Sequence, residues 1–178
     1  MREVKIFARA GQGAITTATI LGESLFYEGK CAYAFPYFGA ARMGAPMNAF
    51  VRFDDKPVRF RSQIYKPDYI LVVDPTLIEN QKCFDNLKDG AKAIVAVREK
   101  TVIPEVAGVE IKALPAEEIA MEIIGKPFAN TVLVGAFAKT TGQIKLESVL
   151  KAVEGRFKSK PKLLEKNLEA VKKGYESV

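Results

Sequence analysis

A glycine pair near the amino terminus is the first place where this chain can do chemistry. Gly11, Gln12 and Gly13 stand between a short apolar segment and a long helical pattern. The first N–H groups of a helix have no partner inside the helix, and the helix dipole adds partial positive charge there. A phosphate or carboxylate is the natural ligand of such a loop, and Arg9 lies beside it. A tight strand-to-helix turn without a ligand is the alternative, because Thr16 breaks the dinucleotide fingerprint, which needs Gly or Ala there.

A second candidate is the segment of residues 35–46, which is rich in Gly and Ala and contains Arg42. Ala32–Phe35 predicts a strand that Pro36 ends, and residues 37–47 follow neither a helical nor a strand period, so we expect a structured loop there. Small residues let a ligand or a neighbouring chain approach the backbone closely. Arg42 offers a fixed charge for an anion. The alternative is a packed loop with Arg42 in solvent.

Three arginines form a third candidate. Residues 47–53 and 58–63 alternate like strands around a turn at Asp54–Pro57, which predicts a hairpin. Arg59 and Arg61 would then share one strand face, with Arg52 on the partner strand. Such a group suits a phosphate-bearing ligand or an acidic partner. A charged edge strand in solvent is the alternative.

The residue types that are missing restrict the chemistry further. The chain has no histidine, which excludes Ser-His-Asp and Cys-His mechanisms. Its two cysteines, Cys31 and Cys83, have no ferredoxin-type spacing and are interpreted as reduced thiols. We therefore expect no metal or iron–sulfur site and no catalytic side chain in this chain, and positioning and charge stabilisation remain as its roles.

The elements that must position these residues follow a strand-and-helix order. Val4–Phe7 predicts a strand, and the apolar spacing of residues 14–27 predicts a helix that Gly29 ends. Continuous apolar runs at 69–73 and 93–97 predict buried strands. Asp74 follows the first run, where α/β sheets bind ligands, although Asp-Pro favours a simple turn. Further helices are expected from Pro115, from Asn130 as a cap, at 146–153, and after Ser159.

This order predicts an α/β fold: a three-layer α/β/α sandwich around a mixed, mostly parallel sheet. The length of 178 residues fits a single domain spanning 1–178. There is no apolar run of bilayer length and no signal-peptide pattern, so we expect no membrane contact and a cytoplasmic location.

The positive charge lies mostly at the carboxyl end. The formal net charge is +6, and residues 151–178 contribute +4 of it, from 8 Lys/Arg and 4 Asp/Glu. A basic tail can meet nucleic acid, form a solvated helix face or dock an acidic subunit. The tail has few aromatics and no nucleic-acid motif, so we expect no nucleic-acid partner.

Several segments, in order along nearly the whole chain, resemble the gamma subunits of pyruvate and related 2-oxoacid:ferredoxin oxidoreductases. AGQGAITTATIL resembles their GGQGxxTxxxIL opening, and YFGAARMGAPMNAFVR resembles their FGxERRGAPVxAFxR segment. Further blocks that resemble theirs are Pro67-Asp68 with VVDPTLIE, NTVLVGA from Asn130, and EKNLEAVKKGY from Glu165. Ala8, Ala10, Ala41 and Met43 depart from the family's Gly, Gly, Glu and Arg.

The resemblance implies a non-autonomous subunit. The complex would convert a 2-oxoacid, coenzyme A and oxidised ferredoxin into acyl-CoA, carbon dioxide and reduced ferredoxin, reversibly. Thiamine diphosphate and iron–sulfur clusters would lie on the partners, which are alpha, beta and ferredoxin-like delta subunits. This chain would supply scaffold and part of the CoA or anion site. The resemblance suggests the following residues for that site: Arg9, Gly11, Gln12, Gly13 and Arg42. A stand-alone nucleotide- or CoA-binding module and a purely structural subunit are the alternatives.

Overall fold

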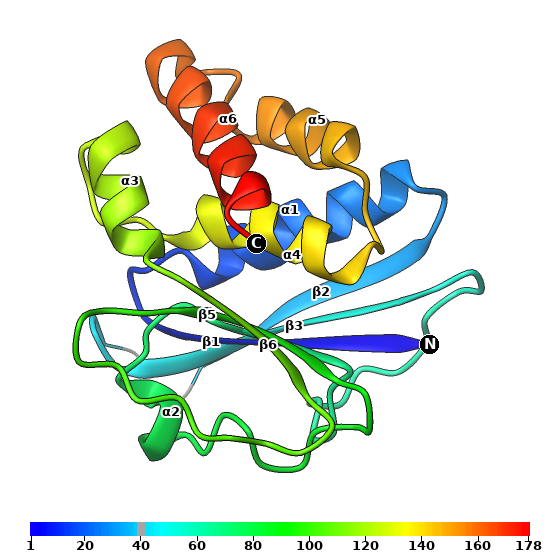
Figure 1. The fold of residues 1–178 in the computed structure, drawn as a ribbon. Helices are drawn as coiled ribbons and strands as arrows, with labels where there is room; N and C mark the ends of the chain where they lie inside the picture. Colours follow the sequence, from blue (N-terminus) through cyan, green and yellow to red (C-terminus); the bar gives the residue numbers. More distant parts are fainter. Residues whose placement is uncertain (39–41) are drawn as a thin grey trace.

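A computed structural model describes residues 1–38 and 42–178 of the chain. Strands dominate the first two thirds of the chain, and four consecutive helices end it (Figure 1). The elements are β1 (Arg2–Arg9), α1 (Ala14–Tyr27), β2 (Cys31–Phe38), β3 (Pro46–Asp54), β4 (Tyr69–Val72), α2 (Leu77–Asn80), β5 (Lys92–Ala96), β6 (Glu110–Leu114), α3 (Ala116–Ile124), α4 (Asn130–Thr141), α5 (Leu146–Phe157) and α6 (Pro161–Glu176).

The six strands form one sheet in the order β2-β3-β1-β4-β5-β6. β1, β4, β5 and β6 run parallel to one another, whereas β3 pairs antiparallel with both β1 and β2. The predicted mixed, mostly parallel sheet is confirmed. The apolar runs at β4 and β5 lie inside the sheet, as expected for strands covered on both faces.

Helices cover the two faces of the sheet unequally (Figure 1). α1 and α4 lie against the sheet, and α3, α5 and α6 pack on them as an outer tier. In the part of the chain that the structure describes, the opposite face carries only the short helix α2 and long loops. Side chains of β1 point to both faces of the sheet. Val4 and Ile6 belong to the core under the helices, and Phe7 belongs to the core under α2. Helices on both faces of the sheet confirm the predicted layers.

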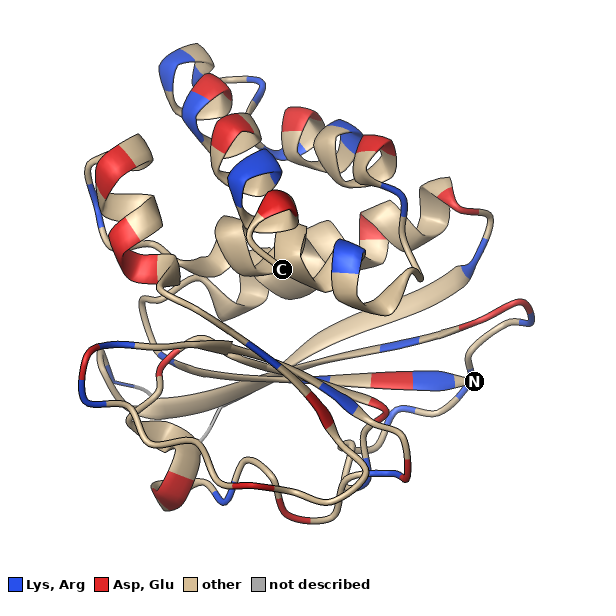
Figure 2. Cartoon of the chain, viewed as in Figure 1, with Lys and Arg blue, Asp and Glu red and all other residues tan. Residues whose placement is uncertain are grey.

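α4 is the central helix of the helical side. Figure 2 shows it nearly free of charged residues, whereas both signs alternate along α5 and α6. α6 crosses α4 at two glycines, Gly135 on α4 and Gly174 on α6. A Cβ on either glycine would overlap a backbone carbonyl oxygen of the other helix, at Val171 and Val132 respectively. The two backbones therefore approach as closely as only glycine permits.

The predicted hairpin around Asp54 is wrong. β3 ends at Asp54, and residues 55–68 form a loop, so Arg59 and Arg61 do not lie on a strand. The reason is tertiary: the buried guanidinium of Arg52, a β3 residue, binds the backbone carbonyls of residues 60, 62 and 63, so a side chain and not a backbone ladder joins this segment to β3. β3 finds its antiparallel partners in β2 and β1 instead.

Three further boundaries differ from the sequence prediction. β2 continues past Pro36 to Phe38, which an edge strand tolerates because only β3 pairs with it. Asn130 is the first residue of α4, not its cap: Ala129 occupies the cap position, and no side-chain cap bond forms there. The cap position of α6 is Lys160 and not Ser159, and no side-chain cap bond forms there either.

Candidate functional site

The glycine loop joins the carboxyl end of β1 to the start of α1 in a backbone conformation that requires glycine. Gly11 has φ 101° and Gly13 has φ 81°, both left-handed. Space is equally restrictive, because a Cβ at Gly13 would lie 2.9 Å from Asn130 Nδ2 and one at Gly11 would lie 2.8 Å from Met43 Cε. The backbone at Gly11 and Gly13 therefore lines the start of α1 without a side chain of its own.

The Asp74 carboxylate anchors the glycine loop through hydrogen bonds. Gln12 Nε2 donates to Asp74 Oδ2 at 2.7 Å, and the Arg9 N–H donates to Gln12 Oε1 at 2.7 Å. The Thr76 N–H and hydroxyl donate to Asp74 Oδ1 at 2.9 and 2.6 Å. Burial raises the pKa of Asp74, but the hydrogen bonds from Thr76 and Gln12 outweigh it and leave this pKa below its ordinary value. Asp74 thus locks the loop as a buried carboxylate.

Arg9 ties the glycine loop to the second candidate segment. Its guanidinium donates to Thr76 Oγ1 at 2.9 Å and to Gly44 O at 3.1 Å, and lies 3.3 Å from Asp74 Oδ2. Two backbone hydrogen bonds join Ala10 to residues 44 and 45, at 3.0 and 2.9 Å. Segments separated by more than thirty residues are therefore neighbours, as a shared site requires.

The structure distributes the predicted site residues unevenly. Gly11, Gln12 and Gly13 line one cavity, which Arg9 does not line. The polar side-chain groups of Arg9 and Gln12 bond to Thr76 and Asp74 within the protein. Arg42 is exposed and accepts a backbone hydrogen bond from the Ala45 N–H at 3.2 Å. Residues 39–41 of the same predicted loop lie outside the described residues.

The cavity beside the glycine loop measures about 300 Å³ and opens between the helices. Its walls come from the starts of α1 and α4, the α3–α4 connection and α6. They include the following residues: Gly11, Gln12, Gly13, Thr16, Lys126, Phe128, Asn130 and Asn167. The Lys126 ammonium lies 5.8 Å from the centre of the Phe128 ring. Two helix N-termini and one ammonium therefore face a partly apolar hollow, which suits an anion with an organic body.

Comparison with known proteins gives the chain a family. Residues 3–177 match the model of the family described as pyruvate ferredoxin/flavodoxin oxidoreductase. The chain belongs to this family. The predicted resemblance is thereby confirmed over nearly the whole sequence.

Individual relatives agree with the family match. Pyruvate synthase subunit PorC of Methanocaldococcus jannaschii is 44% identical over 98% of this chain and 96% of its own. The Pyruvate/ketoisovalerate oxidoreductases common subunit gamma of Thermococcus litoralis is 43% identical over 99% and 96%. The crystal structure of pyruvate oxidoreductase subunit PORC from Thermotoga maritima superposes with TM-score 0.83, at 32% identity, covering 99% of this chain and 96% of that one.

Sequence reasoning missed the far wall of the cavity in this oxidoreductase-family chain. Lys126 and Phe128 come from the α3–α4 connection, more than a hundred residues after the glycine loop. The one available signal was the Gly-Lys-Pro-Phe sequence between two helical patterns, which predicts a turn but not its neighbour.

Metal and membrane features are limited in the described ranges. Among residues 1–38 and 42–178, no group of three His, Cys, Asp or Glu side chains is placed to hold a metal ion. Both cysteines are free, and burial raises the pKa of Cys83 to about 12. In the same ranges no helix combines the length and the apolar character that crossing a bilayer demands.

Proposed function

We propose that this chain is the gamma subunit of a pyruvate-type 2-oxoacid:ferredoxin oxidoreductase and forms one wall of its coenzyme A site. Family membership and full-length relatives that carry pyruvate synthase and oxidoreductase gamma-subunit names support the first part. The complex would take a 2-oxoacid, coenzyme A and oxidised ferredoxin to acyl-CoA, carbon dioxide and reduced ferredoxin. The whole of 1–178 would act as one domain.

The cavity at the glycine loop carries the second part of the proposal. A coenzyme A molecule combines phosphate groups with an adenine ring and an apolar arm. Backbone amides at the start of α1 and the Lys126 ammonium would take phosphate oxygens. Phe128, which is 43% exposed, would offer its ring to an apolar part of the ligand. The hollow of about 300 Å³ has room for the phosphate-bearing part and not for the whole molecule.

The residues present fit such a group. A Cβ at Gly13 would come against Asn130, so the open backbone there is built into the fold. No acidic residue lies in the first turn of α1 or α4, so nothing there repels an anion. Arg9 and Gln12 would act by positioning the loop through Asp74, and Arg42 would add charge at the rim.

The chemical step would belong to the companion subunits. Coenzyme A supplies the thiol that accepts the acyl group. Thiamine diphosphate and the iron–sulfur clusters would lie on alpha, beta and ferredoxin-like delta subunits, through which ferredoxin is reduced. The role left for this chain is to bind and orient an anionic ligand.

The test is kinetic and uses the reconstituted complex. Lys126→Ala and Gly13→Ala should each raise the KM for coenzyme A by about tenfold, the effect of losing one phosphate contact, with little change in the KM for pyruvate. Lys172→Ala, which removes an exposed charge at the far end of α6, serves as the matched control.

The outcomes separate the alternatives. If the KM for coenzyme A stays within about twofold in both variants, the chain is a structural subunit and the proposal fails. If the isolated chain binds coenzyme A with submicromolar affinity, the chain is a binding module in its own right.

A further inference from the structure

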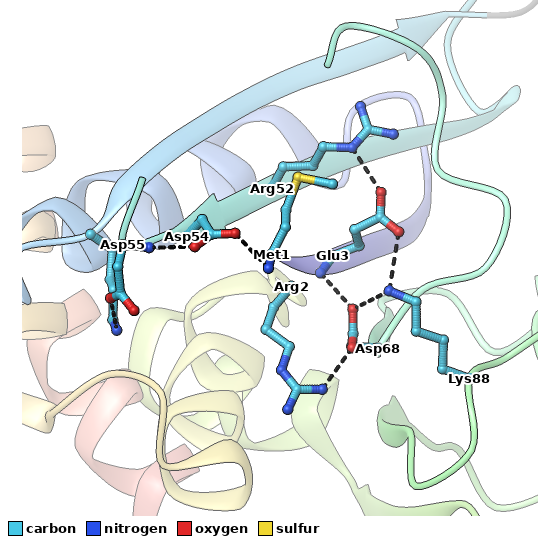
Figure 3. Close-up of polar contacts among 9 residues, drawn as sticks. Met1, Arg2, Glu3, Arg52, Asp54, Asp55, Asp68 and Lys88 are labelled. Carbon is cyan, nitrogen blue, oxygen red and sulfur yellow. Dashed lines mark hydrogen bonds and ion pairs between the residues drawn. The ribbon is translucent and has the colours of Figure 1, made fainter. Parts of the chain in front are cut away.

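A buried arginine organises the surface opposite the helices. Arg52 is 3% exposed, and its Nε donates to Glu3 Oε1 at 2.8 Å. Glu3 also lies 3.3 Å from Lys88 Nζ, and Lys88 Nζ donates to Asp68 at 2.7 Å (Figure 3). This network lies at the amino end of β1, whereas the glycine loop follows its carboxyl end. The two features are therefore at opposite ends of one strand.

The guanidinium of Arg52 also fixes a loop. Nη1 donates to the carbonyl oxygens of Phe60, at 3.4 Å, and of Ser62, and Nη2 donates to Gln63 O at 3.0 Å. Three backbone carbonyls of one loop thus share one buried cation. We call residues 56–66 the Arg52-anchored loop.

The outward side of the Arg52-anchored loop combines aromatic rings with positive charge. Phe60 is 63% exposed and Tyr65 is 73% exposed. The loop sequence, KPVRFRSQIYK, contains four Lys or Arg and no carboxylate. All four of these cations are exposed: Lys56, Arg59, Arg61 and Lys66. Contact of these aromatic rings with water is unfavourable, yet the buried ionic network around Arg52 holds the loop that carries them. Folding alone does not require such an arrangement.

The loop continues into a row of rings on the edge strand β2. Arg61 lies 3.7 Å from the centre of the Tyr33 ring, and Tyr33 stacks on Phe35 at 5.1 Å. Phe35 reaches Phe50 of β3 at 5.2 Å, and Tyr37 reaches it at 6.5 Å. These rings lie on the face of β2 opposite α1, because the alternating Ala32 and Ala34 pack into the core under the helices. Loop and rings form one continuous aromatic and basic surface.

We propose that this surface, the Arg52-anchored loop with Tyr33, Phe35 and Tyr37, docks an acidic face of another subunit of the oxidoreductase complex. Tyrosine and arginine are the residue types that concentrate binding energy at interfaces. Because the loop is already fixed, its ordering does not have to be repeated at association. Among the described residues none of these four exposed cations forms an ion pair, and such a group selects a partner surface rich in Asp and Glu.

The experiment measures assembly of the full-length chain with the complex that lacks it. Arg59→Glu with Arg61→Glu should raise the dissociation constant by more than about tenfold and flatten its dependence on salt. Phe60→Ser should weaken binding severalfold and leave the salt dependence unchanged, because no charge is altered. Both sites are exposed, so thermal unfolding of the variants should follow the wild type.

The matched control is Lys162→Glu with Lys172→Glu on α6, which makes the same change in net charge on exposed residues of the helical side. It should leave the dissociation constant within about twofold, as expected for charges outside an interface. Equal affinities of the loop variant and the control would overturn the proposal. So would a wild-type chain that binds single-stranded oligonucleotides through Arg59 and Arg61 while assembly is unaffected. The KM for coenzyme A in assembled complex should not change, which keeps this test separate from that of the cavity.

Discussion

The crossing of α4 and α6 yields a prediction whose sign is set by two opposing effects. Replacing Gly174 by Ala adds helix propensity of about 1 kcal/mol. The new methyl would overlap Val132 O and would lie 3.0 Å from Val132 Cα, and neither atom can rotate away. Overpacking against backbone costs about 3 kcal/mol, and separating the helices unpacks part of the buried Val171 side chain, about 1 kcal/mol more. The clash therefore wins, and we expect a net loss of about 3 kcal/mol.

Urea unfolding followed by circular dichroism measures this loss directly. A destabilisation of about 3 kcal/mol corresponds to a fall in Tm of roughly 6–12 °C for a domain of this size. Gly135→Ala should behave alike, because its Cβ would overlap Val171 O and lie 2.9 Å from the Tyr175 nitrogen.

Gly155→Ala on α5 is the control. Its Cβ would meet only a Glu23 carboxylate oxygen at 4.0 Å, so helix propensity acts alone and stability should rise by up to about 1 kcal/mol. If Gly174→Ala is as stable as the wild type, or if Gly155→Ala loses as much, close backbone approach is not what holds α6 on α4.

Two further predictions concern titratable groups. Because the folded-state pKa of Asp74 is depressed, its contribution to stability is present above the unfolded value of about 3.9 and is lost as pH falls through the folded value. Asp74→Asn should therefore lower stability at pH 7 by about 1–3 kcal/mol and reduce the loss of stability on acidification below about pH 4. Thermal unfolding as a function of pH measures both effects. An unchanged dependence of stability on acid pH would contradict this prediction. Cys83 is buried and its pKa is raised to about 12, so it should resist a thiol reagent at about pH 8 in the native protein and react fully in urea. The half-buried Cys31 should react first. Peptide mass spectrometry measures the labelling, and rapid labelling of Cys83 in the native protein would contradict its buried position.

Local rules predicted the parts of the fold that depend on local chemistry. The spacing of apolar residues predicted α1 from Ala14 to Tyr27, and the structure has those bounds. Gly142, in the left-handed conformation, ends α4, as a glycine after a helical pattern is expected to do. The glycines at 11 and 13 likewise predicted a backbone-lined turn, and their positive φ values bear that out. In each case the determining atoms lie within one turn of the chain.

Features that depend on distant partners were not predictable in this way. Residues 58–63 alternate as a strand does, yet Arg52 captures their carbonyls and makes them a loop. Asn130 is a residue type that often caps helices, but its side chain lies beside Gly13 of the glycine loop instead. Lys126 lines the candidate site because of how α3 and α4 pack, and the spacing of residues in the sequence does not predict that packing. Of the proposed site, the sequence could therefore predict the glycine wall and not the opposite one.

The two hydrogen bonds of the Gln12 side chain affect the rate at which a ligand can bind. Both ends of that amide are occupied, its oxygen by the Arg9 N–H and its nitrogen by Asp74. The loop consequently has its final shape before any anion arrives, and no slow rearrangement has to precede or follow encounter. Association at this loop should therefore show a single phase whose rate rises linearly with ligand concentration, limited by diffusion and charge and not by the protein's own motion.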